Sequence, residues 1–254
     1  MCPILFQLGR FTVYAYGSIL GLGFVVGMTL VFLKARKEGI PIERVIELFC
    51  LAIFSSLIGA RGLYVLLNFS IFRGEPSRIL RVWEGGLVFY GGFLLAVATA
   101  IGYMRRHQLA PWKTADLFTP SIALGLFFAR IGCFMAGCCY GSVTSLPWAV
   151  TFTDPRSLAR LNAALHPTQL YEAGSGLALF LFLIWIEKRK AYDGQAFWLF
   201  LLLYSLVRFL IEFVRDDPRG FLWGTFLSTS QVIGICLAIL SLFMLFYLRR
   251  RCRR

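Results

Sequence analysis

Three arginines lie where the surrounding sequence is apolar. Arg61, Arg130 and Arg208 fall within or at the edges of long hydrophobic stretches. An arginine near the centre of a lipid bilayer costs about 2.5–3.5 kcal/mol on insertion scales, so it usually faces a polar interior with an anionic partner. A guanidinium donates two parallel hydrogen bonds and keeps its charge at low dielectric, which suits a phosphate. The three arginines therefore predict a polar chamber for a phosphate anion, and a phospholipid headgroup is the obvious candidate.

Acidic residues offer an alternative explanation of these arginines. Glu47, Glu172 and Glu212 could pair with them internally, or the arginines could extend to the membrane surface. Glu212 follows Arg208 by four residues on one predicted helix, so the two share a face, and Arg215 lies one turn beyond. Because the neighbouring residues are apolar, an inward-facing polar stripe is favoured over a solvated ion pair.

Two glycine-rich segments are suited to bring the backbone close to a ligand. Residues 129–141 read ARIGCFMAGCCYG, which predicts an unwound stretch that lines a cavity, with helix packing by small residues as the alternative. Residues 83–92 read WEGGLVFYGG, which predicts a re-entrant or tightly turned start of a helix. Tyr90 then lies at headgroup depth, either in the site or in an interfacial aromatic belt.

The segment HPTQLYE at residues 166–172 opens another predicted helix. Pro167 fits the first turn, and Thr168 or His166 could cap the helix. Glu172 lies one turn further into an apolar helix, where a carboxylate needs a partner. The segment is therefore either a plain helix cap or a part of the polar chamber.

Cys133, Cys138 and Cys139 are the only clustered cysteines among the seven of the chain. They could be inert packing groups, or two of them could form a disulfide in an oxidising compartment. With His166 they could supply four zinc ligands, although this spacing is not that of a standard zinc site. Cys138 could also be a nucleophile that carries a lipid transiently. The sequence does not choose among these roles, and we predict neither a metal ion nor a cofactor.

The composition indicates that a membrane surrounds these residues. The chain has 254 residues, of which 58% are hydrophobic and 15% charged, and its mean hydropathy is +0.72. These values exclude a disordered chain and a coiled coil, and they argue against a water-soluble globule. The net charge of +13 lies in short clusters between apolar runs, which argues against nucleic-acid binding.

The apolar stretches predict an all-α integral membrane protein with a single polytopic domain over residues 1–254. A hydrocarbon core about 30 Å thick needs about 20 apolar residues per helix. About seven stretches meet this requirement: 13–33, 45–67, 87–104, 117–136, 169–186, 195–214 and 229–248.

The distribution of basic residues predicts the orientation. Fifteen lysines and arginines lie on the first, third and fifth connections and at the C-terminus, whereas eight lie on the opposite side, and every lysine is in the first group. We therefore expect the N-terminus outside and the C-terminus in the cytoplasm. The segments 68–86 and 137–168 then form a head on the outer face.

Five motifs, in chain order, closely resemble the prolipoprotein diacylglyceryl transferase family and cover most of the chain. They are YG at 16–17, RVWEGG…GG at 81–92, RIG…G at 130–141, HPTQLYE at 166–172 and R…EF…R at 208–215. Members of the family are seven-span enzymes with an outward N-terminus, in agreement with the charge distribution. The resemblance implies transfer of diacylglycerol from phosphatidylglycerol to the lipobox cysteine thiol of a precursor lipoprotein, with release of glycerol phosphate.

The resemblance also implies roles for individual residues. Arg130 and Arg208 would contact the phosphatidylglycerol headgroup, with Tyr16, Gly141 and Glu212 in the surrounding site. We add Arg61, Gly132, Cys133 and Cys138 as further substrate-binding candidates. The acceptor thiol must become a thiolate, so a base or a positive field is needed nearby. The residues that could act as this base are His166, Glu172, Glu212 and Tyr90.

The chain departs from the family pattern at three positions. Tyr90 stands where the family usually has histidine, Cys133 where it has asparagine, and Cys138 where it has glutamate. These departures keep two alternatives open: a paralogue with another acceptor, or a non-enzymatic lipid-binding or transport protein. The expected partners are phosphatidylglycerol, lipobox signal peptides and membrane lipids, and the expected location is the bacterial cytoplasmic (inner) membrane.

Overall fold

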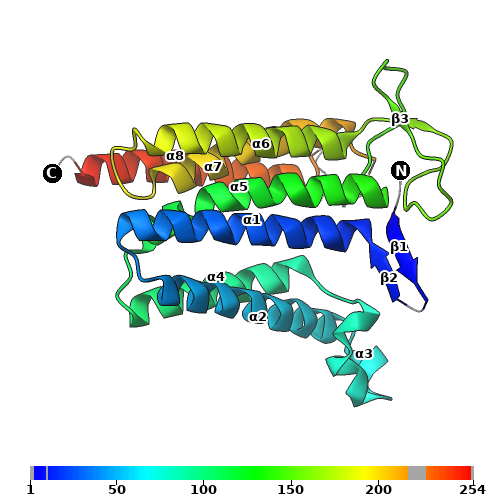
Figure 1. Ribbon diagram of the computed structural model, residues 1–254, viewed down its shortest axis with the longest axis horizontal. Coiled ribbons are helices and arrows are strands. Elements are labelled where there is room, and N and C mark those ends of the chain that lie inside the picture. Colours follow the sequence, from blue (N-terminus) through cyan, green and yellow to red (C-terminus); the bar gives the residue numbers. More distant parts are fainter. Residues whose placement is uncertain (1–2, 10, 217–226, 253–254) are drawn as a thin grey trace. The chain divides into compact units, whose positions relative to one another are not determined.

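Long apolar helices make up most of the computed structural model, which describes residues 3–9, 11–216 and 227–252 (Figure 1). Each of the seven predicted stretches coincides with one helix. The helices are α1 (Ala15–Glu38), α2 (Ile42–Leu67), α4 (Phe89–Arg106), α5 (Pro111–Ala136), α6 (Thr168–Glu187), α7 (Gln195–Ile211) and α8 (Thr229–Cys252). Six of them, all but α4, are long and apolar enough to cross a membrane. The chain is therefore a multi-pass, all-α membrane protein, while the seventh span and the orientation stay predictions.

The helix ends follow the charged and glycine residues of the sequence. Basic side chains occupy the last turn of α1, α4 and α8, where they complement the helix dipole and stop the apolar run: Arg36 and Lys37, Arg105 and Arg106, and Arg249 to Arg251. Gly39 after α1 and Gly194 before α7 have positive φ angles of 67° and 89°, which glycine adopts without strain. The predicted span ends thus have a local cause.

The chain divides into two compact units, residues 32–114 and the remainder. In the first unit, α2 and α4 pack closely because glycines face each other. A Cβ atom on Gly59 would overlap the carbonyl oxygen of Gly91, and one on Gly91 would overlap that of Gly59. Close approach of this kind is the usual means by which membrane helices associate. The connection between these helices holds three short helices: α3 (Phe69–Phe72), η1 (Pro76–Leu80) and η2 (Val82–Glu84).

In the second unit, α5, α6 and α7 share an apolar core. Ala123, Leu179, Leu183, Ala196 and Phe200 form this core and are all buried. Helix α8 packs against α7. The buried Asp116 of α5 accepts hydrogen bonds from the backbone N–H groups that begin α7, at 2.8 and 2.9 Å. This carboxylate fixes the N-terminus of α7, and its position did not follow from the sequence pattern.

Four short strands, which the sequence did not predict, lie at one end of the second unit (Figure 1). Strands β1 (Ile4–Leu8) and β2 (Phe11–Tyr14) form an antiparallel hairpin that leads directly into α1. Strands β3 (Val150–Thr151) and β4 (Ala164–Leu165) pair antiparallel within the predicted head segment 137–168. A small core of Phe152, Ala159 and Leu165 holds that segment together.

Candidate functional site

Glu172 is a buried carboxylate held between two guanidinium groups. It is 1% exposed and lies in the first two turns of α6. Its Oε2 is 2.7 Å from Nε of Arg130, and its Oε1 accepts a hydrogen bond of 2.8 Å from Nη1 of Arg215. Arg130 comes from α5, and Arg215 follows α7 and the short helix η3 (Glu212–Val214). The predicted need of Glu172 for a partner is thus confirmed.

Glu212 forms the second half of the same arrangement. Its Oε2 is 2.6 Å from Nη2 of Arg208 and 4.0 Å from Nε of Arg215, and its Oε1 accepts a hydrogen bond of 2.8 Å from Ser228. The predicted shared face of Arg208 and Glu212 is confirmed. Because Arg215 contacts both glutamates, it joins the two ion pairs into one network.

We call Arg130, Glu172, Arg208, Glu212 and Arg215 the arginine–glutamate cluster. Three guanidinium groups and two carboxylates give these five side chains an excess of one positive charge. Nη1 of Arg208 is buried and has no hydrogen-bond partner among the residues that the structure describes. A buried charged donor without a partner is costly, so the position favours an added anion. The cluster is therefore suited to bind a negatively charged group.

Arg61 lies in the other unit and binds backbone. All five N–H groups of its guanidinium donate to carbonyl oxygens, at 2.5 to 3.2 Å, and the acceptors belong to Arg78, Ile79, Arg81, Gly85 and Gly86. Gly85 and Gly86 have positive φ angles of 84° and 71°, which confirms the predicted tight turn before α4. The buried charge of Arg61 is thus satisfied by carbonyl groups of the 68–86 segment, not by an acid.

Glu47 was the third acid offered as a partner for the buried arginines. Its Oε2 accepts hydrogen bonds from the Tyr103 hydroxyl and, at 3.0 Å, from Nη1 of Arg44. Arg44 lies three residues earlier on the same helix. Glu47 therefore belongs to an ion pair near the start of α2, and the structure gives it no contact with Arg61.

Gly141 lies where three segments cross. Its N–H donates to the carbonyl oxygen of His166 at 2.9 Å, and the next N–H, that of Ser142, donates to the carbonyl of Val214 at 2.9 Å. A Cβ atom on Gly141 would overlap the Val214 carbonyl and come within 2.7 Å of side-chain atoms of His166 and Thr168. Only glycine therefore fits between the cysteine-bearing segment, the start of α6 and the end of η3.

The His166 ring lies next to hydroxyl and indole groups. Its Nδ1 is 3.3 Å from the Tyr171 hydroxyl, which accepts a hydrogen bond of 2.8 Å from the Trp148 indole. The predicted cap at this helix is wrong, because neither His166 nor Thr168 caps α6 with its side chain. The side chain of Thr168 instead donates to a carbonyl of the cysteine-bearing segment described below.

Tyr16 and Tyr90, the two tyrosines among the predicted site residues, lie in different units. Tyr16 follows the β1–β2 hairpin and packs on Gly132 of α5, where a Cβ atom would lie 3.1 Å from the tyrosine ring. Tyr90 lies in the first turn of α4, is 53% exposed and meets Phe89 edge to face at 5.8 Å. The structure thus places Tyr16 beside the helix that carries Arg130.

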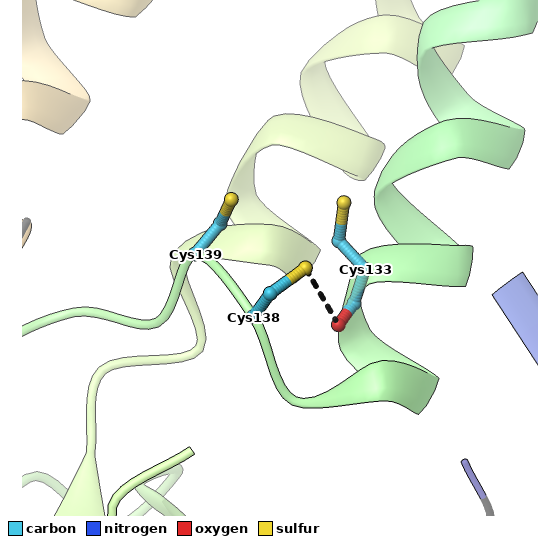
Figure 2. Close-up of side chains that lie close together, drawn as sticks. All are labelled: Cys133, Cys138 and Cys139. Carbon is cyan, nitrogen blue, oxygen red and sulfur yellow. Dashed lines mark hydrogen bonds between the residues drawn. The ribbon is translucent and has the colours of Figure 1, made fainter. Parts of the chain in front are cut away.

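The three clustered cysteines meet where α5 ends (Figure 2). The helix continues to Ala136, so the predicted unwound stretch is wrong for residues 129–136; the backbone leaves the helix at Gly137, which has a φ angle of 78°. The Sγ atoms of Cys133, Cys138 and Cys139 lie within 4.8 Å of one another, and all three thiols are free. Cys139 has a φ angle of 59°, which turns the chain back toward Cys133.

Neighbouring groups give the three thiols different acidities. Hydrogen bonds from the Cys133 and Cys138 thiols, aided by the Arg215 guanidinium, hold the pKa of Cys139 well below its usual range. Hydrogen bonds to Cys133 and Cys139 raise the pKa of Cys138. Cys139 is therefore the most acidic of the three thiols.

Two buried side chains of α6 hold the cysteine-bearing segment. Thr168 Oγ1 donates to the Cys139 carbonyl at 2.7 Å, and Gln169 Nε2 donates to the Cys138 carbonyl at 2.8 Å. Both side chains are at most 1% exposed. The role of Gln169 was not predicted from the sequence, although the polar residues Thr168, Gln169 and Glu172 in the first turns of an apolar helix were a visible signal.

Fold and site together define a multi-pass membrane protein whose buried arginine–glutamate cluster is suited to an anion. Comparison with known proteins gives a more specific result: the chain belongs to the prolipoprotein diacylglyceryl transferase family, whose model matches residues 3–247. A phosphatidylglycerol–prolipoprotein diacylglyceryl transferase of Clostridium tetani is 34% identical over 96% of each chain. Proteins of the same name from Vibrio cholerae and Geobacter sulfurreducens are also 34% identical, over 98% of this chain and over 92% and 96% of their own.

Proposed function

We propose that the chain transfers the diacylglyceryl group of phosphatidylglycerol to the lipobox cysteine thiol of precursor lipoproteins. Family membership and the names of relatives of nearly equal length support this function. The observation that carries it is the arginine–glutamate cluster, with its excess positive charge and with Nη1 of Arg208, which has no hydrogen-bond partner in the described part of the chain. A phosphodiester headgroup supplies the anion that this cluster lacks.

The transfer replaces one bond to a glyceryl carbon with another. The thiolate sulfur attacks the glyceryl carbon that carries the phosphate, a C–S thioether forms, and the C–O bond to phosphate breaks. Glycerol phosphate leaves with the electron pair of that bond, so negative charge grows on its oxygen. Arg130 and Arg208 would stabilise this charge as fixed donors in a site shielded from water. Glu172 and Glu212 would hold the guanidinium groups in place.

The same contacts bear on the base that accepts the thiol proton. Glu172 and Glu212 each meet two guanidinium groups, so both carboxylates already serve as ion-pair partners. His166 has no such ion pair with any residue that the structure describes, and its backbone carbonyl adjoins Gly141 between the cysteine-bearing segment and η3. We therefore favour His166 over the two glutamates as the base.

Function in the cell can be tested by complementation. The chain is expressed in a bacterium depleted of its own diacylglyceryl transferase, and the lipidation of a reporter lipoprotein is followed by mass spectrometry. We expect the unmodified chain to restore lipidation and the Arg208→Lys variant to fail. Arg156→Lys, in an exposed ion pair with Asp154, serves as the matched control and should restore lipidation. Equal reporter lipidation with the unmodified chain and with the empty vector would contradict the proposed acceptor.

The proposed location is the bacterial inner membrane, with the N-terminus and the 137–168 segment outside. A tag inserted in this segment at 142–165 should be reachable from outside the cell, and a reporter fused after Arg254 should be cytoplasmic. Protection of the tag in intact cells would contradict the orientation and would place the segment on the wrong side for exported lipoproteins.

A further inference from the structure

The transfer step as proposed uses none of the thiols of Cys133, Cys138 and Cys139, yet the fold brings these three thiols together. Cys133 lies in the last turn of α5, and the positive φ angles of Gly137 and Cys139 return the chain to it. A non-glycine residue in this backbone region costs roughly 1–2 kcal/mol. The conformation at Cys139 is therefore maintained against a local penalty.

The geometry of the three sulfurs matches a shared metal ion. Their Sγ atoms lie within 4.8 Å of one another (Figure 2). Three thiolates that bind one ion at about 2.3 Å have their sulfurs roughly 4 Å apart. Side-chain rotations that move each sulfur by about a few tenths of an ångström therefore suffice to close the site. The backbone that carries two of the ligands is held in place, because Thr168 donates to the Cys139 carbonyl and Gln169 to the Cys138 carbonyl.

The donor set determines the class of metal. Three thiolates form a soft site, and soft sulfur ligands select ions such as Cu(I) and Zn(II). Within the described residues, no histidine or acidic side chain joins the three sulfurs as a fourth ligand. Structural zinc sites are almost always four-coordinate, whereas Cu(I) accepts three thiolates. The set thus fits Cu(I) better.

We propose that Cys133, Cys138 and Cys139 bind one Cu(I) ion through three thiolates. Binding releases the thiol protons, and the product, one Cu(I) with three thiolates, carries two negative charges. The guanidinium group of Arg215 is in direct contact with Cys139. This positive charge stabilises a metal–thiolate group whose net charge is negative. It would disfavour a metal site whose net charge is positive, such as a cation held by uncharged ligands. The sequence alone did not predict a metal, because the spacing resembles no standard site.

Titration of the purified protein with Cu(I) tests the proposal without any measurement of transfer. The protein in detergent, reduced and kept under argon, receives Cu(I) in competition with bicinchoninate, whose copper complex is measured by absorbance. We expect one equivalent to bind. Cys133→Ser, Cys138→Ser and Cys139→Ser should each weaken binding at least ten-fold, whereas Cys50→Ser and Cys236→Ser, at exposed positions, should not. The same affinity in the cluster variants and in these controls would overturn the proposal.

Alkylation of the unmodified protein provides a test that does not depend on the folding of variants. With one equivalent of Cu(I), the three clustered thiols should become resistant to iodoacetamide, while Cys50, Cys236 and Cys252 should react as before. Unchanged reactivity of the clustered thiols would overturn the site. Displacement of Cu(I) by one equivalent of Zn(II) would overturn the choice of metal. Because neither assay involves lipid transfer, failure of the proposed function leaves these results interpretable.

Discussion

Replacement of Arg208 by lysine separates the structural role of this residue from its role toward a phosphate. Nη2 of Arg208 forms the 2.6 Å contact with Glu212, and Nη1 is a buried donor that has no hydrogen-bond partner within residues 3–9, 11–216 and 227–252. A lysine ammonium can keep the ion pair with Glu212, but it lacks the planar fork that presents a second donor. Loss of one donor to a developing oxyanion costs about 2.7–4 kcal/mol, or roughly 100- to 1000-fold in rate. We therefore expect Arg208→Lys to fold normally and to transfer about 100- to 1000-fold more slowly.

The assay for this variant is the initial rate of thioether formation on a lipobox peptide, with phosphatidylglycerol in mixed micelles. Arg156→Lys is the matched control, because its ion pair with Asp154 is exposed and should contribute little. Thermal unfolding of both variants in detergent checks the fold. A rate for Arg208→Lys within three-fold of the unmodified protein would refute the reasoning and reduce Arg208 to a structural ion pair.

Three further changes follow from the described contacts. Gly141→Ala should lower the free energy of unfolding, measured by denaturant titration, by about 1–3 kcal/mol because the added methyl group overpacks the site. Gly174→Ala, where a Cβ atom meets nothing within 4 Å, should leave the free energy of unfolding unchanged. Equal losses in the two variants would contradict the close crossing of three segments at Gly141. Glu172→Gln should lower the free energy of unfolding by about 3–5 kcal/mol, since removal of the carboxylate charge leaves the buried guanidinium groups uncompensated. A loss below about 1 kcal/mol would contradict this role of Glu172. Hydrogen bonds from Arg156 lower the pKa of Asp154 to about 2, so this carboxylate should stay ionised on acidification until about pH 2. Arg156→Ala should raise the titration midpoint of Asp154 measured by NMR. An unchanged midpoint would exclude Arg156 as the cause of the low pKa.

Hydropathy and local charge patterns were sufficient to place the helices. All seven predicted stretches coincide with helices because each needs only an apolar run ended by basic residues, glycine or proline. The same local reasoning gave the Arg208–Glu212 pair, since residues four apart share a helix face. The strands were missed because they are short and depend on pairing partners, and β3 and β4 have only two residues each.

Contacts between distant segments could not be predicted in this way. Arg215 was counted among the basic residues of an outer connection, but its side chain is 2% exposed and contacts Glu172, 43 positions away. Arg61 was expected in the polar chamber because burial of its charge was visible, whereas its carbonyl partners were not. The meeting of the three cysteines depends on the left-handed backbone at Gly137 and on the support of Gln169 from α6.

Mass spectrometry of both products of one reaction tests the central claim most directly. The purified protein is incubated with phosphatidylglycerol and a lipobox peptide, and the peptide and the released glycerol phosphate are quantified together. We expect the peptide cysteine to gain one diacylglyceryl group for each glycerol phosphate released, and neither product to form with Arg208→Lys on the same time scale. Release of glycerol phosphate without peptide modification would contradict the proposed acceptor. Absence of both products from the unmodified protein would contradict the transfer itself.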